Sequence, residues 1–180
     1  MPAVKLKQRE PNGRHKRPSA EERQRREREA YQVEMRTVLR QPHRRDMAQP
    51  EHPWCASMLG RFCLIHKVRR ELHDCAADYA SLLHRWNVAK GIPMPDSTGV
   101  AGTGLGPSAA TVAAWWRDIQ AMEAAMKRSL PGKQGNIAFA AVRHIAVDGA
   151  SIPPEYVPAA IQAMLALANH MGHKLNHPFV

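Results

Sequence analysis

Apolar residues recur at intervals of three and four along most of this chain, and this spacing constrains the fold more than any other feature. The longest run consists of Val68, Leu72, Cys75, Tyr79, Leu82, Leu83 and Trp86. Such a stripe gives a helix one apolar face, and Gly91 with Pro93 beyond it is typical of a helix end. We therefore expect a long amphipathic helix that ends near Lys90. The apolar residues around Gly60 form either a separate short helix or a bent extension of the same one.

Four further segments have the same periodicity, and capping residues mark where they begin. Ser19 with Glu22 has the spacing of a capping box, and Ser108 and Asn136 are candidate caps for two later helices. Pro153 and Pro154 precede the last periodic segment, and no segment alternates with period two. The sequence therefore predicts an all-α domain of five to six helices in an orthogonal or bundle-like arrangement.

Charge is distributed unevenly along the 180 residues. The chain carries 26 Lys and Arg against 16 Asp and Glu, a net charge of +10. Residues 1–50 hold 14 basic and 7 acidic residues (+7), residues 51–90 hold 6 and 4 (+2), and residues 91–180 hold 6 and 5 (+1). We expect a disordered basic tail over 1–18, a charged helix and proline-rich connection over 19–54, and a nearly neutral helical domain over 55–180.

The basic tail over 1–18, which we call the arm, is the candidate for binding a partner. Prolines and Gly13 interrupt its cations, and it has too little apolar surface to offset the entropy of ordering, so we expect a flexible segment. Cations of this kind neutralise phosphates and release counterions. The candidate nucleic-acid-binding residues are Lys5, Lys7, Arg9, Arg14, Lys16, Arg17, Arg23, Arg25, Arg26 and Arg28. A solubilising tail and an arm that docks on an acidic protein remain alternatives, whereas the lack of an apolar face or lipidation motif argues against a membrane surface.

The helix that follows the arm has two different halves. Its first half is charged all round, with Glu21 and Glu22 each four residues before an arginine, the favourable order for helix pairs. Tyr31, Met35 and Leu39 then supply an apolar stripe before proline ends the helix. We expect the first half to face solvent or a partner and the second half to pack.

No group of residues predicts catalysis, a metal ion or a cofactor. The three cysteines include no CxxC pair and no export signal precedes them, so we expect reduced thiols in the cytoplasm, with Cys63 and Cys75 in the core. His170 and His173 could share a helix face, but no further ligand completes a zinc site. The glycines over 99–106 follow no predicted strand and precede no Gly-Lys-Ser/Thr ending, so they predict a connection rather than a phosphate loop.

Two blocks of sequence resemble uncharacterised small helical proteins of alphaproteobacterial phages and prophages. The first is Leu59-Gly-Arg-Phe-Cys-Leu with Tyr79-Ala-Ser-Leu-Leu-His-Arg-Trp and Lys90-Gly-Ile-Pro-Met-Pro. The second is Val142-Arg-His-Ile-Ala-Val-Asp-Gly with Ala166-Leu-Ala-Asn-His-Met-Gly. The resemblance implies a transcription regulator whose closing helices are similar to a degenerate helix-turn-helix of the sigma-factor region-four type.

The last helix departs from a working helix-turn-helix. Residues 155–171 contain no Lys or Arg, and only Gln162 and Asn169 could read base edges, so we expect this helix to serve packing. The sequence therefore favours a non-enzymatic, cytoplasmic, DNA-associated regulator that binds through the arm and first helix, with a protein of the transcription machinery as a further partner. The alternative is a helical assembly, adaptor or packaging subunit that self-associates, since adjacent Trp115 and Trp116 cannot both face one core.

Overall fold

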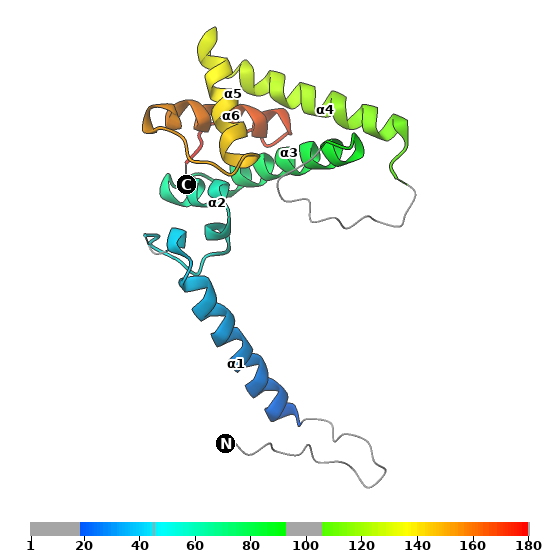
Figure 1. Cartoon of the computed structure of the whole chain (residues 1–180). Coiled ribbons are helices and arrows are strands. Elements are labelled where there is room, and N and C mark those ends of the chain that lie inside the picture. Colours follow the sequence, from blue (N-terminus) through cyan, green and yellow to red (C-terminus); the bar gives the residue numbers. More distant parts are fainter. Residues whose placement is uncertain (1–18, 45, 93–105, 180) are drawn as a thin grey trace. The chain divides into compact units, whose positions relative to one another are not determined.

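The computed structural model describes residues 19–44, 46–92 and 106–179, and within these ranges the chain is all-α, as the sequence predicts (Figure 1). The basic arm and residues 93–105 of the glycine-rich connection lie outside the described residues. The chain divides into two units, residues 1–51 and 52–180, which we describe in turn. None of the described helices combines the length and the apolar character that crossing a lipid bilayer requires.

The first unit contains helix α1 (Ala20–Leu39), which begins where the capping box predicts. Ser19 Oγ accepts a hydrogen bond from the backbone N–H of Glu22 at 3.1 Å, which pairs a donor that the first turn would leave free. The 3₁₀ helix η1 (Pro42–Arg44) follows. The Arg44 guanidinium donates to Gln41 Oε1 at 2.9 Å and to the Pro50 carbonyl at 2.8 Å. This side chain thereby ties together the connection after α1.

Within its own unit, the second half of α1 does not pack as expected. Tyr31, Val33 and Leu39 are 61%, 63% and 43% exposed. Among the described residues of this unit, only Arg44 is buried, at 5% exposure. No described apolar side chain of the unit is buried to the same extent. Hydrophobic burial inside the unit therefore does not stabilise α1, which depends on its cap and on pairs between neighbouring turns.

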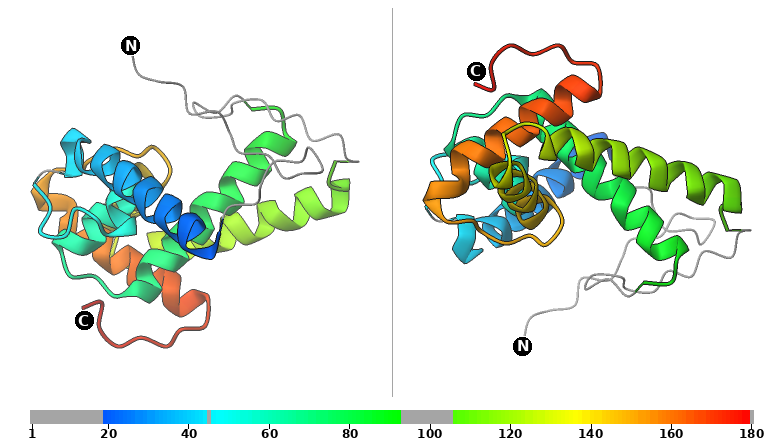
Figure 2. Two further views of the ribbon diagram at one scale, coloured as in Figure 1. Left: turned by 90° about the horizontal axis from the view of Figure 1, so that it is seen from below. Right: turned by 90° about the horizontal axis from the view of Figure 1, so that it is seen from above.

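In the second unit the helices pack around the last of them (Figures 1 and 2). The helices are α2 (Met58–Ile65), α3 (Arg70–Ala89), α4 (Ala109–Lys127), α5 (Lys133–Ala146) and α6 (Val157–His170), with the 3₁₀ helices η2 (Pro53–Ala56) and η3 (Pro154–Tyr156). Helix α6 contacts α3, α4 and α5. Its buried residues are Ala160, Ile161, Ala163, Met164, Leu167 and Ala168. The expectation that this helix serves packing is confirmed.

Helix α3 is the long amphipathic helix that the sequence predicts. Its buried stripe is Leu72, Cys75, Ala76, Tyr79 and Leu83. The chain leaves the helix at Gly91, whose φ of 68° is a left-handed conformation that favours glycine. The apolar residues upstream form the separate helix α2, which Ser57 caps by accepting a hydrogen bond from Gly60 N at 3.0 Å. This settles the alternative left open by the sequence in favour of two helices.

One predicted helix start is right and one is wrong. Ser108 Oγ accepts a hydrogen bond from Thr111 N at 3.1 Å and caps α4 as expected. Asn136, in contrast, does not cap α5, because the helix already begins at Lys133 and Asn136 lies in its first turns. Gly132 precedes the helix with a φ of 58°, and this left-handed residue turns the chain tightly from α4 into α5 without a polar cap.

The three cysteines are packing residues, as expected for Cys63 and Cys75. Cys55 is buried as well, and none of the three forms a disulfide. Burial, with Asp74 adding to it, raises the pKa of the Cys63 thiol to about 12. Burial, with Asp78 and other carboxylates adding to it, raises the pKa of Cys75 to about 11. Both thiols are therefore protonated near neutral pH, and neither is poised as a nucleophile.

We expect the free energy of unfolding to fall as the pH rises above 9.0, the ordinary pKa of these thiols. Between that value and the raised native pKa, the unfolded chain releases protons that the native chain keeps, so rising pH favours unfolding. Urea denaturation on both sides of pH 9 measures the effect. The variant Cys63→Ala lacks the most strongly shifted thiol and should have a shallower pH dependence; an unchanged dependence would contradict the explanation.

Candidate nucleic-acid interface

All four arginines predicted for the interface are exposed on α1, and two of them form ion pairs. Arg26 pairs with Glu22 at 2.6 Å, as the spacing predicts. Arg25 pairs with Glu29 at 3.6 Å rather than with Glu21. The side chains of these pairs are 40–70% exposed, so each pair contributes little and is easily exchanged for another anion.

Arg23 and Arg28 have no ion pair with another described residue. The four arginines from Arg23 to Arg28 are separated by two, one and two positions, so at about 100° per residue they point to different sides of the helix. The helix as a whole carries five arginines and five glutamates. Helix α1 is therefore net neutral and has three arginines, Arg23, Arg28 and Arg36, without an ion pair to another described residue, rather than a cationic face.

The excess charge of the first 50 residues consequently belongs to other segments. The other six predicted residues, Lys5, Lys7, Arg9, Arg14, Lys16 and Arg17, lie outside the described residues. The only acidic residue in 1–18 is Glu10, so these residues carry a net charge of +5. Arg40, Arg44 and Arg45 against Asp46 supply the remaining +2. The arm is thus the most cationic part of the chain.

The polar face at the start of α3 does not add a phosphate-binding surface. Arg69 pairs with Glu71 at 3.1 Å, and Arg70 pairs with Asp74 at 3.2 Å. The arginine of each pair already has an anion beside it. This is the solvated face of mixed sign that the sequence indicates.

The last helix offers no base-reading surface either. Asn169, one of its two candidate residues, is committed to the chain itself. Its amide donates to the Leu175 carbonyl at 3.1 Å, and its Oδ1 accepts from Leu175 N at 2.6 Å. Gln162, the other candidate, and His170 at the end of the helix are left as exposed polar side chains on α6. Among the described residues, no three His, Cys, Asp or Glu side chains are grouped to hold a metal ion.

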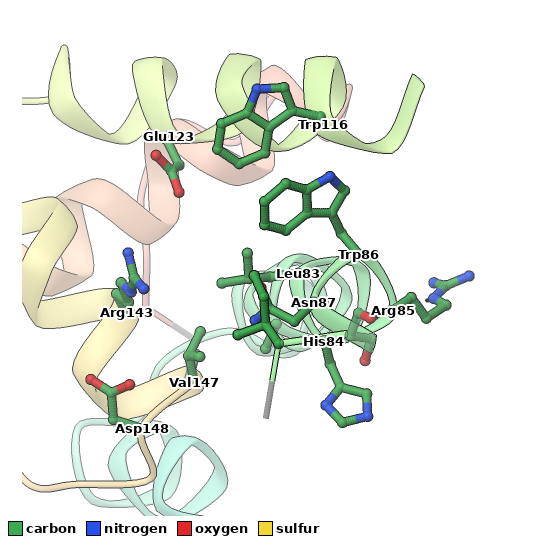
Figure 3. Close-up of a pocket in the computed structure, with 14 residues that line it drawn as sticks. Leu83, His84, Arg85, Trp86, Asn87, Trp116, Glu123, Arg143, Val147 and Asp148 are labelled. Carbon is green, nitrogen blue, oxygen red and sulfur yellow. Dashed lines mark hydrogen bonds between the residues drawn. The ribbon is translucent and has the colours of Figure 1, made fainter. Parts of the chain in front are cut away.

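A groove of about 970 Å³ lies between α3, α4 and α5 (Figure 3). Trp86 of α3 and Trp116 of α4 stack along one side, with ring centroids 4.5 Å apart and ring planes at 21°. Glu123 and Arg143 lie on the opposite side, and Leu83 lies between the two sides (Figure 3). The groove thus combines a flat aromatic wall with a charged one.

The two charged groups of that wall differ in how far they are already paired. Glu123 Oε1 accepts a hydrogen bond from the Tyr79 hydroxyl at 3.1 Å, and Glu123 Oε2 lies 3.6 Å from Lys127 Nζ. Arg143 is exposed, and its guanidinium has no hydrogen bond or ion pair with another described residue. The nearby Glu123 carboxylate also raises the pKa of Tyr79, after burial, the larger cause. Arg143 is the uncommitted charge of the groove.

Sequence reasoning did not find this groove, although one pattern pointed towards it. Adjacent Trp115 and Trp116 indicated that one of the two rings lies at an edge of the core, and Trp116 is 37% exposed. That its partner is Trp86, and that Arg143 faces the pair, depends on how three helices pack. No family model, no curated protein and no solved structure matches this chain.

Proposed function

We propose that the protein associates with nucleic acid, with DNA as the expected form, through its basic arm. The observation that supports this proposal is the separation of charge. Residues 1–18 carry +5, α1 is neutral, and the 130 residues from 51 to 180 together carry +3. A segment with six cations and little apolar surface interacts with a polyanion through phosphate neutralisation, which needs no fixed structure in the free protein.

The proposed role is that of a regulator rather than an enzyme. The proposed place of action is the cytoplasm, and the proposed target is DNA, as the resemblance to phage-type regulators implies. The arm supplies affinity that is largely independent of sequence. Arg23 and Arg28 of α1 add two cations that are not committed to the protein's own carboxylates. The buried helix α6 takes no part in binding bases.

The salt dependence of DNA binding tests the proposal. If the arm neutralises about five phosphates, the logarithm of the association constant should fall with the logarithm of salt concentration with a slope of about −4.5. Fluorescence anisotropy with a labelled duplex measures this slope. Replacing all six arm cations by glutamine should remove this part of the slope and leave at most the share of Arg23 and Arg28, about −1.8.

The double variant Arg25→Gln and Arg26→Gln is the matched control, because it removes two cations that are already paired within α1. We expect it to reduce the slope by less than one unit in total, whereas each arm cation should contribute close to one. A slope near zero in the unmodified protein, or an unchanged slope after the six arm substitutions, would overturn the proposal.

A second candidate function is a self-associating assembly subunit, which the exposed apolar side chains of α1 support. Tyr31 and Val33 of α1 are each more than 60% exposed. Contact with a second copy would bury such side chains. Light scattering of the unmodified protein and of the Tyr31→Glu, Val33→Glu variant tests it: a defined oligomer that the variant dissociates supports assembly, and a monomer at high concentration rules it out.

A further inference from the structure

We propose that the groove between α3, α4 and α5 binds one unstacked guanine base of a single-stranded nucleic acid. The inference concerns the second unit alone and does not depend on the arm. It follows from three properties of the groove: its aromatic wall, the uncommitted Arg143, and the pattern of donors and acceptors beside it (Figure 3).

The aromatic wall suits a planar ring. Trp86 and Trp116 come from different helices and hold each other in a stack, so the surface that they present is fixed before any ligand arrives. Trp116 retains 37% exposure. Stacking of a base on an aromatic side chain raises affinity by about 5- to 150-fold. The volume of about 970 Å³ accommodates a base with its sugar.

The opposite wall suits the edge of guanine. Arg143 presents free N–H donors, and guanine O6 and N7 form the pair of acceptors that an arginine fork contacts. Asp148, which lines the same groove, is about half exposed, and its Oδ2 lies 3.2 Å from His144 Nδ1. Its other oxygen is left to accept from the N1–H and amino groups of guanine. Adenine places an amino donor beside N7, where it would face the donors of Arg143.

Other occupants satisfy this groove less well. A phosphate alone would find Arg143 and Arg85 in the groove together with the carboxylates of Glu123 and Asp148, and it would leave the two tryptophans uncovered. An aliphatic side chain would cover the tryptophans but would make no use of the exposed Arg143. A base inside a duplex has its Watson–Crick edge occupied and cannot enter a recess without leaving the stack. An unstacked guanine meets all three properties.

The test distinguishes the contribution of the guanine base to binding from that of the phosphate backbone. An abasic tetrahydrofuran oligomer about nine units long, within the range of single-strand site sizes, is compared with the same oligomer carrying one central guanine. Both oligomers carry the same number of phosphates, so the arm should bind both with the same affinity. We expect the guanine to raise affinity about tenfold and to shift the indole N–H resonances of Trp86 and Trp116. Trp54, which stacks on His73 outside the groove at 4.1 Å, should not shift.

Variants and a mononucleotide complete the design. We expect Trp116→Leu and Arg143→Gln each to abolish most of the gain from guanine, whereas Arg117→Gln, an exposed arginine of α4 outside the groove, should leave it intact. Guanosine monophosphate should shift the same two resonances, but only at a higher concentration than the oligomer. If it binds with the same affinity as the guanine-containing oligomer, the ligand is a free nucleotide and the single-strand proposal is wrong.

Two outcomes distinguish this inference from the proposed function. If the abasic oligomer binds and guanine adds nothing, the groove proposal fails and the arm proposal stands. If the abasic oligomer does not bind but guanine shifts Trp86 and Trp116, the arm proposal fails and the groove proposal stands.

Discussion

Replacing Tyr79 by alanine is expected to lower the free energy of unfolding by about 4 kcal/mol. Tyr79 is fully buried on α3 and is among the largest side chains of the core. Its removal leaves a cavity that the surrounding helices fill only in part. It also takes away the hydroxyl that donates to Glu123 on α4, so a partly buried carboxylate loses one of its partners. Urea denaturation measures the change.

The variant Tyr79→Phe separates the cavity from the hydrogen bond. It keeps the ring and removes only the hydroxyl, so we expect a loss of about 1.5 kcal/mol, the usual range for a hydrogen bond to a charged group. If the phenylalanine variant loses as much as the alanine variant, the contact with Glu123 rather than the packing of the ring holds α3 against α4, and our account of the core is wrong.

Replacing Gly135 by alanine should lower the free energy of unfolding by about 3 kcal/mol. A glycine inside a helix is ordinarily a weak point, and alanine there would stabilise the helix by about 0.5–1 kcal/mol. At this position a Cβ atom would collide with the carbonyl oxygen of Lys127 and lie 2.8 Å from that of Leu130. Both are backbone atoms, so relief requires α5 to move away from the end of α4.

Gly106→Ala is the matched control for this variant. Gly106 has no heavy atom of the described residues within 4 Å of the added Cβ, so we expect a change in stability within about 0.5 kcal/mol. Thermal or urea unfolding of the two variants beside the unmodified protein measures the difference. A Gly135→Ala protein as stable as Gly106→Ala would show that α4 and α5 do not approach as closely as described.

The elements that sequence reasoning predicted correctly are those decided by residues close together in the chain. The caps of α1 and α4 could be predicted because Ser19 and Ser108 each lie three residues before the backbone N–H from which they accept a hydrogen bond. The buried stripe of α3 followed from its period alone, since one apolar face can be covered only by the core. Local chemistry and helical geometry are sufficient for such predictions.

The elements that were missed depend on packing between segments far apart. Asn136 suggested a later start for α5 as a candidate cap, whereas the helix begins at Lys133 and Gly135 lies inside it against the carbonyl of Lys127. The apolar stripe of α1 predicted packing, and no described partner within its unit supplies it. The groove requires Trp86 and Trp116 to meet across thirty residues of sequence. Six of the ten predicted site residues lie outside the described residues, so their role stays a prediction.

The central place of α6 has a consequence for synthesis on the ribosome. The chain is made from its first residue onward, so α3, α4 and α5 are complete before the helix that fills the space between them. The parts of their apolar faces that α6 covers stay open until residue 170 has left the exit tunnel. The second unit therefore closes its core only after its last helix has been translated, and a nascent polypeptide stalled before α6 would be a substrate for chaperones.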